Sequence, residues 1–458
     1  MANVSDLTLG KFLQIAFSDG VRTQISEDYR DWEHIKMVRE GDPNGRELRF
    51  FLKSSFGPSA VQSRNAGSAG TFPTAQQSSN SEHTAEYKEI DATIQIEYAL
   101  WNRARKSIDK YAEPLLNEIE DKMIACKRYM ASKLYQDGSG IYGVVSSISE
   151  DLGNDEITIT LNVTDSVNGY SHVGYFEFDE VLAAYQDTDV ASAAVRNATG
   201  GAAGNLYKVK DRDRANNTIT IEPVTSAYAT DSSVTASNLV AGDFFTKVGQ
   251  QVVVPPAYTG TKDYGTFTDV IVGLESLAAT DGRSVHGLTM SGALKGTTVD
   301  ASGDPLDASQ IRKVLDDAKI RAGEQRYSYK KMCLAPEAEA AFIESRETDR
   351  RFNSIEDTKR GARVFGYQHR NDLVETYTSE FCPLKRVWIL PEQNNGDKVL
   401  EYHGSDFESV EMEGMGKFHL RPSSSGGHER NVTSYMEAIG QLVCKHPAAI
   451  GRLRNFTL

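Results

Sequence analysis

The chain has 458 residues, of which 25% are charged and 39% hydrophobic, and its formal net charge is −14. This length suggests about three domains, and the composition can supply a packed core. The negative charge excludes a basic footprint for tight nucleic-acid binding, although it leaves loose enclosure of nucleic acid open.

Cysteine usage and hydropathy narrow the class of protein further. The four cysteines are far apart and form no CxxC pair, which favours reduced thiols over a disulfide framework or a zinc site; they are Cys126, Cys333, Cys382 and Cys444. No run of about 18 apolar residues predicts a membrane span. The N-terminus shows no apolar core with a cleavage site, so we expect no signal peptide.

The first part of the chain predicts an arm and then a long hairpin. Residues 1–45 have one short apolar helical face and many charges, and we expect them to lie across another surface. Leu48, Phe50 and Leu52 alternate with other residues at the period of a strand, and residues 90–98 do the same. Residues 57–82 between these strands are rich in Gly, Ser, Ala and Gln. An isolated hairpin is marginal in water, so we expect 46–98 to pack on another copy; a disordered surface loop is the alternative.

A long amphipathic helix is predicted within 99–143. Apolar residues recur there at steps of three and four, which places them on one helical stripe; they are Ile108, Tyr111, Leu115, Ile119, Met123, Cys126, Met130 and Leu134. Charged residues, Lys127 and Arg128 among them, are expected on the opposite, solvated face. Gly138 and Gly140 are expected to end the helix. A core helix of an ordinary globular domain is the simpler interpretation.

Residues 138–143 match the pattern GxGxxG. The dinucleotide-binding motif requires a strand before the glycines and a helix after them. Here a helix precedes them and strand-like residues follow. The pattern therefore indicates a helix end and a turn rather than a phosphate site.

Residues 144–254 differ in composition from their flanks and predict a small β-barrel or sandwich inserted into the main body. Short strands are expected at 157–163, 175–178, 206–209 and 219–221, with turn signals between them. The Ala-rich stretch 181–195 predicts one helix. We expect this module to be separable and exposed on the outer surface, because surface turns tolerate insertions.

The second half predicts a mixed α+β architecture. Asp307 opens a capping box before an apolar helical pattern that stops at Gly323, and Pro336 suits the first position of a second helix. Strands are expected at 329–334, 373–377, 386–390, 399–403 and 435–445.

No pattern in the sequence indicates an active site, a cofactor site or a metal site. GxSxG, HExxH and GxxxxGKS are absent, and His419 and His428 favour exposed loop histidines over metal ligands. One basic cluster stands out in the acidic chain: Arg346, Arg350, Arg351, Lys359, Arg360 and Arg363. It is interpreted as a solvated face, as a contact with enclosed DNA, or as an interface paired with carboxylates such as Glu408, Glu411 and Glu413.

The order of these parts resembles the major capsid proteins of tailed bacteriophages. The local patterns that carry the resemblance are 306–315 (LDASQIRKVL), the strand before Pro336 with its helix, and 381–383 (FCP) before 387–390 (VWIL). The resemblance implies the Hong Kong 97-like capsid fold, which encapsulin shells and herpesvirus capsid floors share. It also implies an α+β class with an N-terminal arm, an extended hairpin loop, a long spine helix, peripheral and axial domains, and here an all-β insertion domain.

The resemblance also implies seven segments with the following boundaries. They are the N-terminal arm 1–45, the extended hairpin loop 46–98, the spine helix 99–143 of the peripheral domain, the β-rich insertion domain 144–254, the peripheral return 255–306, the axial domain 307–408, and the peripheral strands with a C-terminal tail 409–458. The tail is expected from His446. Some members of this family crosslink a lysine to an asparagine. Lys53 lies on the hairpin, but no asparagine can be assigned to it as a partner, so we predict no crosslink.

The function implied is structural and not enzymatic. Many copies, as hexamers and pentamers, would form an icosahedral head that encloses double-stranded DNA without sequence-specific binding. The implied partners are a portal, with scaffolding or decoration proteins as further candidates, and no membrane. The implied location is the virion, after assembly in the host bacterial cytoplasm. Alternatives are an encapsulin-like compartment with protein cargo, a nucleotide-dependent enzyme using 138–143, and a surface-binding module centred on 144–254.

Overall fold

The computed structural model describes part of the chain, and the statements below refer to that part. The described residues are 31, 35–39, 47–55, 79–97, 121, 124–151, 156–162, 171–185, 206–224, 239–248, 270–280, 282–323, 327–347, 353–357, 362–369, 372–393, 396–404, 419–422 and 428–458.

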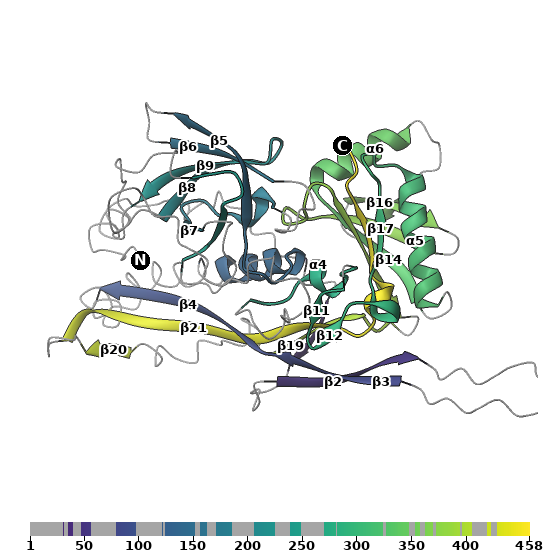
Figure 1. Cartoon of the computed structure of the whole chain (residues 1–458), viewed down its shortest axis with the longest axis horizontal. Helices are drawn as coiled ribbons and strands as arrows, with labels where there is room; N and C mark the ends of the chain where they lie inside the picture. The colour runs from purple at the N-terminus through teal and green to yellow at the C-terminus, as the bar shows by residue number, and fades with distance from the viewer. Residues whose placement is uncertain are drawn as a thin grey trace, which may run out of the picture.

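A seven-stranded mixed sheet forms one side of the molecule (Figure 1). Its strands, in spatial order, are β13 (Thr297–Asp300), β22 (Gly451–Arg454), β18 (Arg386–Gln393), β14 (Tyr327–Leu334), β17 (Asp372–Thr378), β16 (Ala362–His369) and β15 (Asn353–Asp357). The predicted strands of the second half are confirmed where they fall in this sheet. β18 is buried on both faces over residues 386–391, whereas β14 begins with buried residues that alternate with more exposed ones.

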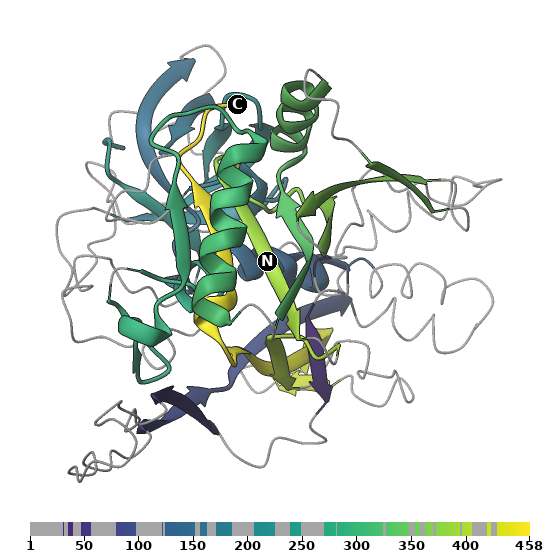
Figure 2. The ribbon, with the colours of Figure 1, turned by 90° about the vertical axis from the view of Figure 1, so that its right-hand side faces the viewer.

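Two helices accompany this sheet, and both begin where the sequence predicts. In α5 (Ala308–Ala322) the Asp307 carboxylate accepts the backbone N–H of Gln310, and Gly323 follows the last turn with φ 91°. Its apolar stripe faces inward, with Ile311 and Val314 fully buried. Figure 2 shows α5 along the face of the sheet, and α6 (Pro336–Glu347) follows β14.

The C-terminal segment is a buried strand, so the predicted tail from His446 is wrong. After a short 3-10 turn, η8 (Pro447–Ala449), the strand β22 pairs in parallel with β13 and antiparallel with β18. Ile450, Leu453 and Phe456 are fully buried. The seven-stranded sheet therefore takes β13 and β22 from outside the predicted 307–408 segment. A four-residue strand such as β22 carries too little periodicity to be recognised locally.

A second sheet of five strands is long and narrow (Figure 1). It contains β1 (Lys36–Arg39), β19 (Leu400–Gly404), β21 (His428–Cys444), β20 (His419–Pro422) and β4 (Lys88–Glu97). Its longest pairing joins β4 to β21 antiparallel, from Asn431↔Glu97 to Gly440↔Lys88. β1 pairs in parallel with β19, so part of the predicted arm 1–45 belongs to the body's own sheet. Residues 1–30 lie outside the described residues.

The predicted hairpin is wrong in its strand pairing. β2 (Glu47–Ser55) pairs antiparallel with β3 (Ser79–Glu86), whereas the second predicted strand, 90–98, is mostly β4 in the five-stranded sheet. β3 has the sequence SNSEHTAE, and this polar composition hides its strand period from a search for alternating apolar residues. The described hairpin is therefore the β2–β3 ribbon, and residues 56–78 lie outside the described part.

Residues 143–247 contain a closed six-stranded barrel, in agreement with the β-rich prediction for this region. In barrel order its strands are β10 (Phe244–Lys247), β5 (Gly143–Asp151), β6 (Glu156–Leu161), β9 (Thr218–Val224), β8 (Leu206–Asp213) and β7 (Val181–Tyr185). Two local predictions are wrong. Residues 181–185 are strand rather than helix, and residues 175–178 form no strand: Tyr175 ends a 3-10 turn, η2 (Val173–Tyr175), and an irregular segment follows.

A helix over 124–135 leads into the barrel, and residues 98–120 before it lie outside the described part. Cys126, Met130 and Leu134 are buried as the apolar stripe predicts. Arg128 was expected on the solvated face, yet it is 3% exposed because the barrel and the seven-stranded sheet cover it with carboxylates. Lys133 lies outside that stripe and is also fully buried.

One connected cluster of buried hydrophobic residues runs through the barrel, the 124–135 helix and both large sheets. Short elements lie at its edge: α4 (Leu274–Leu277), the hairpin of β11 (Ser284–Val285) and β12 (Leu288–Thr289), and the 3-10 turn η5 (Gly292–Leu294). Over the described residues, no helix has both the length and the apolar character of a membrane span.

Candidate assembly site

Side chains that could bind a metal ion do not cluster in the described part of the chain. No group of three or more His, Cys, Asp or Glu side chains there is arranged to hold a metal ion. The GxGxxG residues form a turn between the 124–135 helix and β5, with φ 82° at Gly138 and 84° at Gly140. A Cβ at Gly138 would lie 3.0 Å from the Val272 Cα, so this glycine permits close packing. The predicted helix end and turn is confirmed.

The β2–β3 ribbon has one face on the body and one face in solvent. Leu52, His83 and Ala85 are buried on the inner face. The ribbon is attached near its base, where the Thr84 N–H donates to the His286 carbonyl at 3.3 Å. Phe50 adds an edge-to-face contact to the His286 ring, with centroids 6.5 Å apart. Figure 1 shows the ribbon below the rest of the described structure.

The outer face of the ribbon combines an exposed aromatic ring with charges. Phe51 is 70% exposed. Arg49 lies 3.6 Å from Glu82 and 3.5 Å from Glu47, and all three charged side chains are exposed. Such exposed pairs contribute at most about 1 kcal/mol each to stability. They therefore stabilise the ribbon less than burial of its outer face would. A second surface that covered Phe51 would remove a large apolar side chain from water.

A second feature is the turn between β17 and β18, residues 379–385, where four parts of the chain meet. The Glu380 carbonyl accepts from His172 Nε2 at 2.9 Å and from Arg214 at 3.0 Å, both in the barrel. The Glu380 carboxylate pairs with Arg128 of the helix at 2.5 Å. Ser379 Oγ donates at 3.0 Å to Asp31 in the N-terminal segment.

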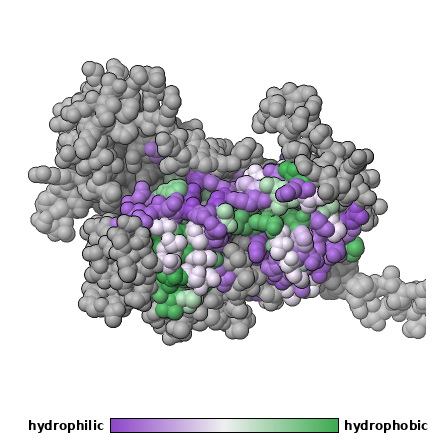
Figure 3. Space-filling view, turned by 90° about the horizontal axis from the view of Figure 1, so that it is seen from above, coloured by the Kyte–Doolittle hydropathy of each residue, from purple (hydrophilic) through white to green (hydrophobic). Residues whose placement is uncertain are grey.

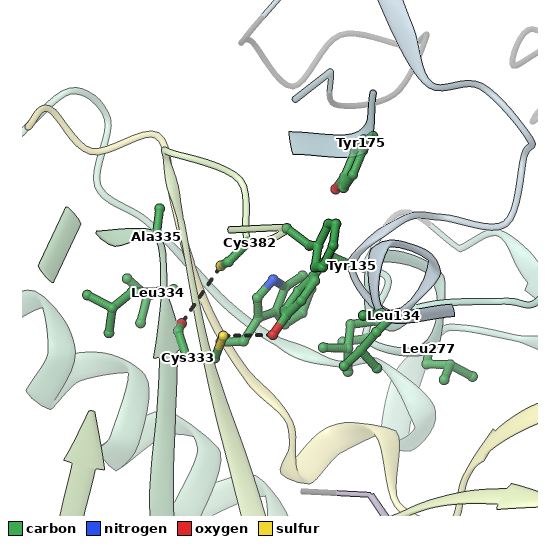
Figure 4. Packing of buried hydrophobic residues seen from close by; sticks show 14 of the residues in the cluster. Leu134, Tyr135, Tyr175, Leu277, Cys333, Leu334, Ala335 and Cys382 are labelled. Atoms are coloured by element: carbon green, nitrogen blue, oxygen red, sulfur yellow. Dashed lines mark hydrogen bonds between the residues drawn. The ribbon is translucent and has the colours of Figure 1, made fainter. Parts of the chain in front are cut away.

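Asp31 is itself held by the 124–135 helix. It is 4% exposed, and the Tyr135 hydroxyl donates to its other oxygen. Figure 4 shows Tyr135 pointing towards Cys333 of β14, whose Sγ lies 2.8 Å from the Tyr135 oxygen. Burial, together with the negative charge of Asp31, holds the pKa of Tyr135 well above its usual value of 10. The hydroxyl therefore keeps its proton and remains a donor.

The barrel makes one further polar contact with the body, and a buried lysine lies just before the barrel. Arg214 forms a two-pronged pair with Glu337 in the first turn of α6, with N–O distances of 3.0 and 3.2 Å. Lys133 Nζ donates to Gln136 Oε1 at 2.7 Å and lies 4.2 Å from the ring centre of Tyr142, just before the barrel. Burial lowers the pKa of Lys133 well below 10.5. The barrel therefore sits on charged groups as well as on apolar ones.

A buried group of charges joins α4 to the seven-stranded sheet. Glu275 of α4 accepts from Arg386 Nε at 2.7 Å and from the Arg452 guanidinium. Burial alone would raise the pKa of Glu275, but the charges of Arg452 and Arg386 outweigh it and lower the pKa to about 2. Arg452 also lies over the Trp388 ring, 5.6 Å from its centre. One carboxylate thus compensates two buried guanidinium groups.

Acid should destabilise the protein through His172, which is 1% exposed. Burial, with help from the charge of Arg214, lowers the pKa of His172 from 6.5 to about 3. Between these values the unfolded chain binds a proton that the folded chain does not, so stability falls as the pH drops from 6.5 towards 3. One such group contributes a slope of up to about 1.4 kcal/mol per pH unit. Urea unfolding at pH 7, 6 and 5 should show this loss.

His172→Gln is the matched variant for this prediction, because a Gln amide can still donate to the Glu380 carbonyl but does not titrate. Its stability should vary less with pH over the same window. Equal pH dependence in the two proteins would contradict the role assigned to His172.

The charged groups named from the sequence lie mostly outside the described residues. Arg350, Arg351, Lys359 and Arg360 do so entirely, as do Glu408, Glu411 and Glu413. For Arg346, Arg363, His419, His428 and Lys53 the structure gives the backbone position only. The interpretations of the basic cluster therefore stay predictions.

Sequence reasoning missed the 379–385 turn because its partners are far away in the chain; 348 positions separate Asp31 from Ser379.

Comparison with known proteins gives matches among solved structures. No protein-family model and no curated protein matches the chain. A capsid protein of cyanophage A-1(L) is 11% identical with a TM-score of 0.49, over 99% of this chain and 100% of the other. A capsid of a native GTA particle is 9% identical with a TM-score of 0.43, over 97% and 95%. A structure of Mycobacterium phage Bobi is 8% identical with a TM-score of 0.39, over 100% of both chains.

The described chain is α+β, with many strands and few helices. Among the solved structures to which it is similar, those of cyanophage A-1(L) and of the GTA particle are described as capsids.

Proposed function

We propose that the chain is the major shell protein of a tailed-bacteriophage head, a structural role in which many copies assemble around double-stranded DNA. The observation that carries this proposal is the β2–β3 ribbon. Its inner face is buried against the body, and Phe51 is exposed on the other face. A two-stranded ribbon is marginal by itself, so a neighbouring copy is the natural cover for this face.

The finer parts of the proposal concern the remaining segments. Residues 99–143 act as the spine helix and 144–254 as an insertion domain. The barrel's first and last strands support the second assignment, because Phe245 of β10 pairs with Gly143 of β5 and the chain enters and leaves the barrel at one place. Hexamers and pentamers of the chain, with a portal and with scaffolding or decoration proteins, would complete a virion shell built in the host bacterial cytoplasm.

The proposed contact with DNA is loose. A formal net charge of −14 opposes tight phosphate binding, since each neutralised phosphate needs a nearby Lys or Arg. Figure 3 shows one face of the molecule, on which hydrophilic bands separate smaller hydrophobic areas. Enclosure by a shell needs no sequence-specific contact, so we propose that the subunit binds DNA weakly and without sequence preference.

Assembly can be tested with one exposed aromatic side chain. Phe51→Ser should raise the protein concentration needed for assembly by at least about tenfold, because burying a Phe side chain is worth about 1.5–3 kcal/mol. Negative-stain microscopy and sedimentation of the full chain at several concentrations would measure this. Circular dichroism should show an unchanged fold, since Phe51 is exposed in the single chain.

Phe178→Ser provides the matched control, because Phe178 is 50% exposed and lies on the barrel rather than on the ribbon. This variant should assemble like the unaltered chain. Equal assembly of all three proteins would remove the ribbon from the interface, and a chain that stays monomeric under every condition would contradict the shell assignment. Shells with protein cargo and no DNA would favour the encapsulin-like alternative.

A further inference from the structure

Two neighbouring residues of the 379–385 turn are bound from different parts of the chain. Ser379 is bound by Asp31, which precedes β1 in the N-terminal segment. Glu380 is bound by the barrel, through His172 and Arg214 at its carbonyl. A movement of the turn that breaks one set of contacts therefore displaces the peptide group that makes the other set.

The barrel backbone packs against this turn without space for an additional side-chain atom. A Cβ added to Gly174 in η2 would lie 2.2 Å from the Glu380 oxygen and 2.7 Å from His172 Nε2. The barrel backbone is therefore pressed directly against the turn, where only glycine fits. On the other side, the Ser379 N–H donates to the Leu334 carbonyl at 3.1 Å, which attaches the turn to the end of β14.

The 124–135 helix links the same two sets of contacts. Tyr135 donates to Asp31, and Arg128 pairs with both Glu380 and barrel Glu177. The Arg128 guanidinium also lies 5.2 Å from the centre of the Phe381 ring. One rigid helix thus holds the N-terminal anchor with one side chain and the barrel joint with another, two helical turns away.

We propose that residues 379–381 form a latch that couples docking of the N-terminal segment to docking of the barrel. When Asp31 leaves Ser379, the turn loses its contact with the N-terminal segment, and the His172 and Arg214 contacts open more often. The coupling is reciprocal, because it is a free energy shared by the two sites. This inference concerns contacts within one chain and does not depend on the proposed function.

Hydrogen exchange on the full chain tests the latch. In Asp31→Asn, the amides of 173–176 in the barrel should exchange at least about fivefold faster, the lower end of typical site–site coupling. The Tyr175 and Phe176 amides report this well because both donate within η2. Ser379→Ala removes a single hydroxyl and should have the same effect, so it keeps the test available if Asp31→Asn aggregates.

The reciprocal variant is Arg214→Gln, which should speed exchange at residues 36–39 of β1. Asp179→Asn is the matched control, because it removes a barrel ion pair with Lys208 at 2.6 Å that does not touch the turn. Asp179 has φ 61°, which Asn accepts easily. This control should leave β1 unchanged. Faster exchange confined to β1 in Asp31→Asn and Ser379→Ala, with residues 173–176 unaffected, would overturn the proposal.

Discussion

Glu275→Gln should lower the free energy of unfolding by about 3–5 kcal/mol, the usual cost of removing one partner from a buried ion group. The substitution keeps the shape of the side chain but removes the negative charge that pairs with both Arg386 and Arg452. Arg386 is fully buried and Arg452 is 4% exposed. Two guanidinium groups would then remain in a poorly solvated site. Urea denaturation of the full chain at pH 7, under conditions that keep it unassembled, measures the loss.

Acid provides an independent check of the same group. The pKa of Glu275 is about 2 in the folded chain and 4.5 ordinarily, because Arg452 and Arg386 outweigh the effect of burial. The contribution of Glu275 to the free energy of unfolding is therefore complete above pH 4.5 and is lost as the pH falls through about 2. The difference in stability between the unaltered chain and Glu275→Gln should shrink over that range.

Glu392→Gln is the control for Glu275→Gln. Glu392 pairs with Lys330 at 3.0 Å, and the Lys330 side chain is 54% exposed. Exposed pairs contribute about 0–1 kcal/mol, so this variant should stay within that limit. Similar losses of unfolding free energy in the two variants would show that burial of the Glu275 ion group adds nothing to stability.

Local signals in the sequence were sufficient where a residue acts on its own neighbours. Asp307 caps α5, Gly323 follows it, and Pro336 opens α6, because capping and backbone preference involve only a few adjacent residues. The apolar stripe of the 124–135 helix likewise reports its buried face directly.

Contacts between residues far apart in the chain could not be predicted from such local patterns. β3 looked like part of a low-complexity tip because its partner β2, rather than its own composition, makes it a strand. Arg128 was placed in solvent because its helix position is polar, although Glu177 and Glu380 bury it. The 379–385 turn shows the limit most clearly, since no spacing in the sequence joins Asp31, His172 and Glu380.

Excision of the barrel should leave a main body that aggregates, contrary to the sequence-based expectation that the module is separable. Residues 144–244 can be replaced by a short Gly–Ser linker, because Gly143 and Phe245 are paired neighbours. Excision removes Phe176 from the Tyr142 ring, 5.9 Å away, in a core that runs without a break into the body. Each aromatic side chain buries about 150–250 Å², so the uncovered surface is large.

The excised piece and a second substitution separate the causes of this aggregation. Residues 143–247 expressed alone should unfold cooperatively, because the closed barrel contains its own buried strands and leaves no sheet edge open. In the excised main body, Tyr142→Ser should recover part of the solubility, since it removes a ring that has lost its cover. Sedimentation and dye binding to exposed apolar surface would measure both effects. A soluble, monodisperse main body with unchanged thermal stability would show that the barrel is a separable insertion and that its shared core contributes little.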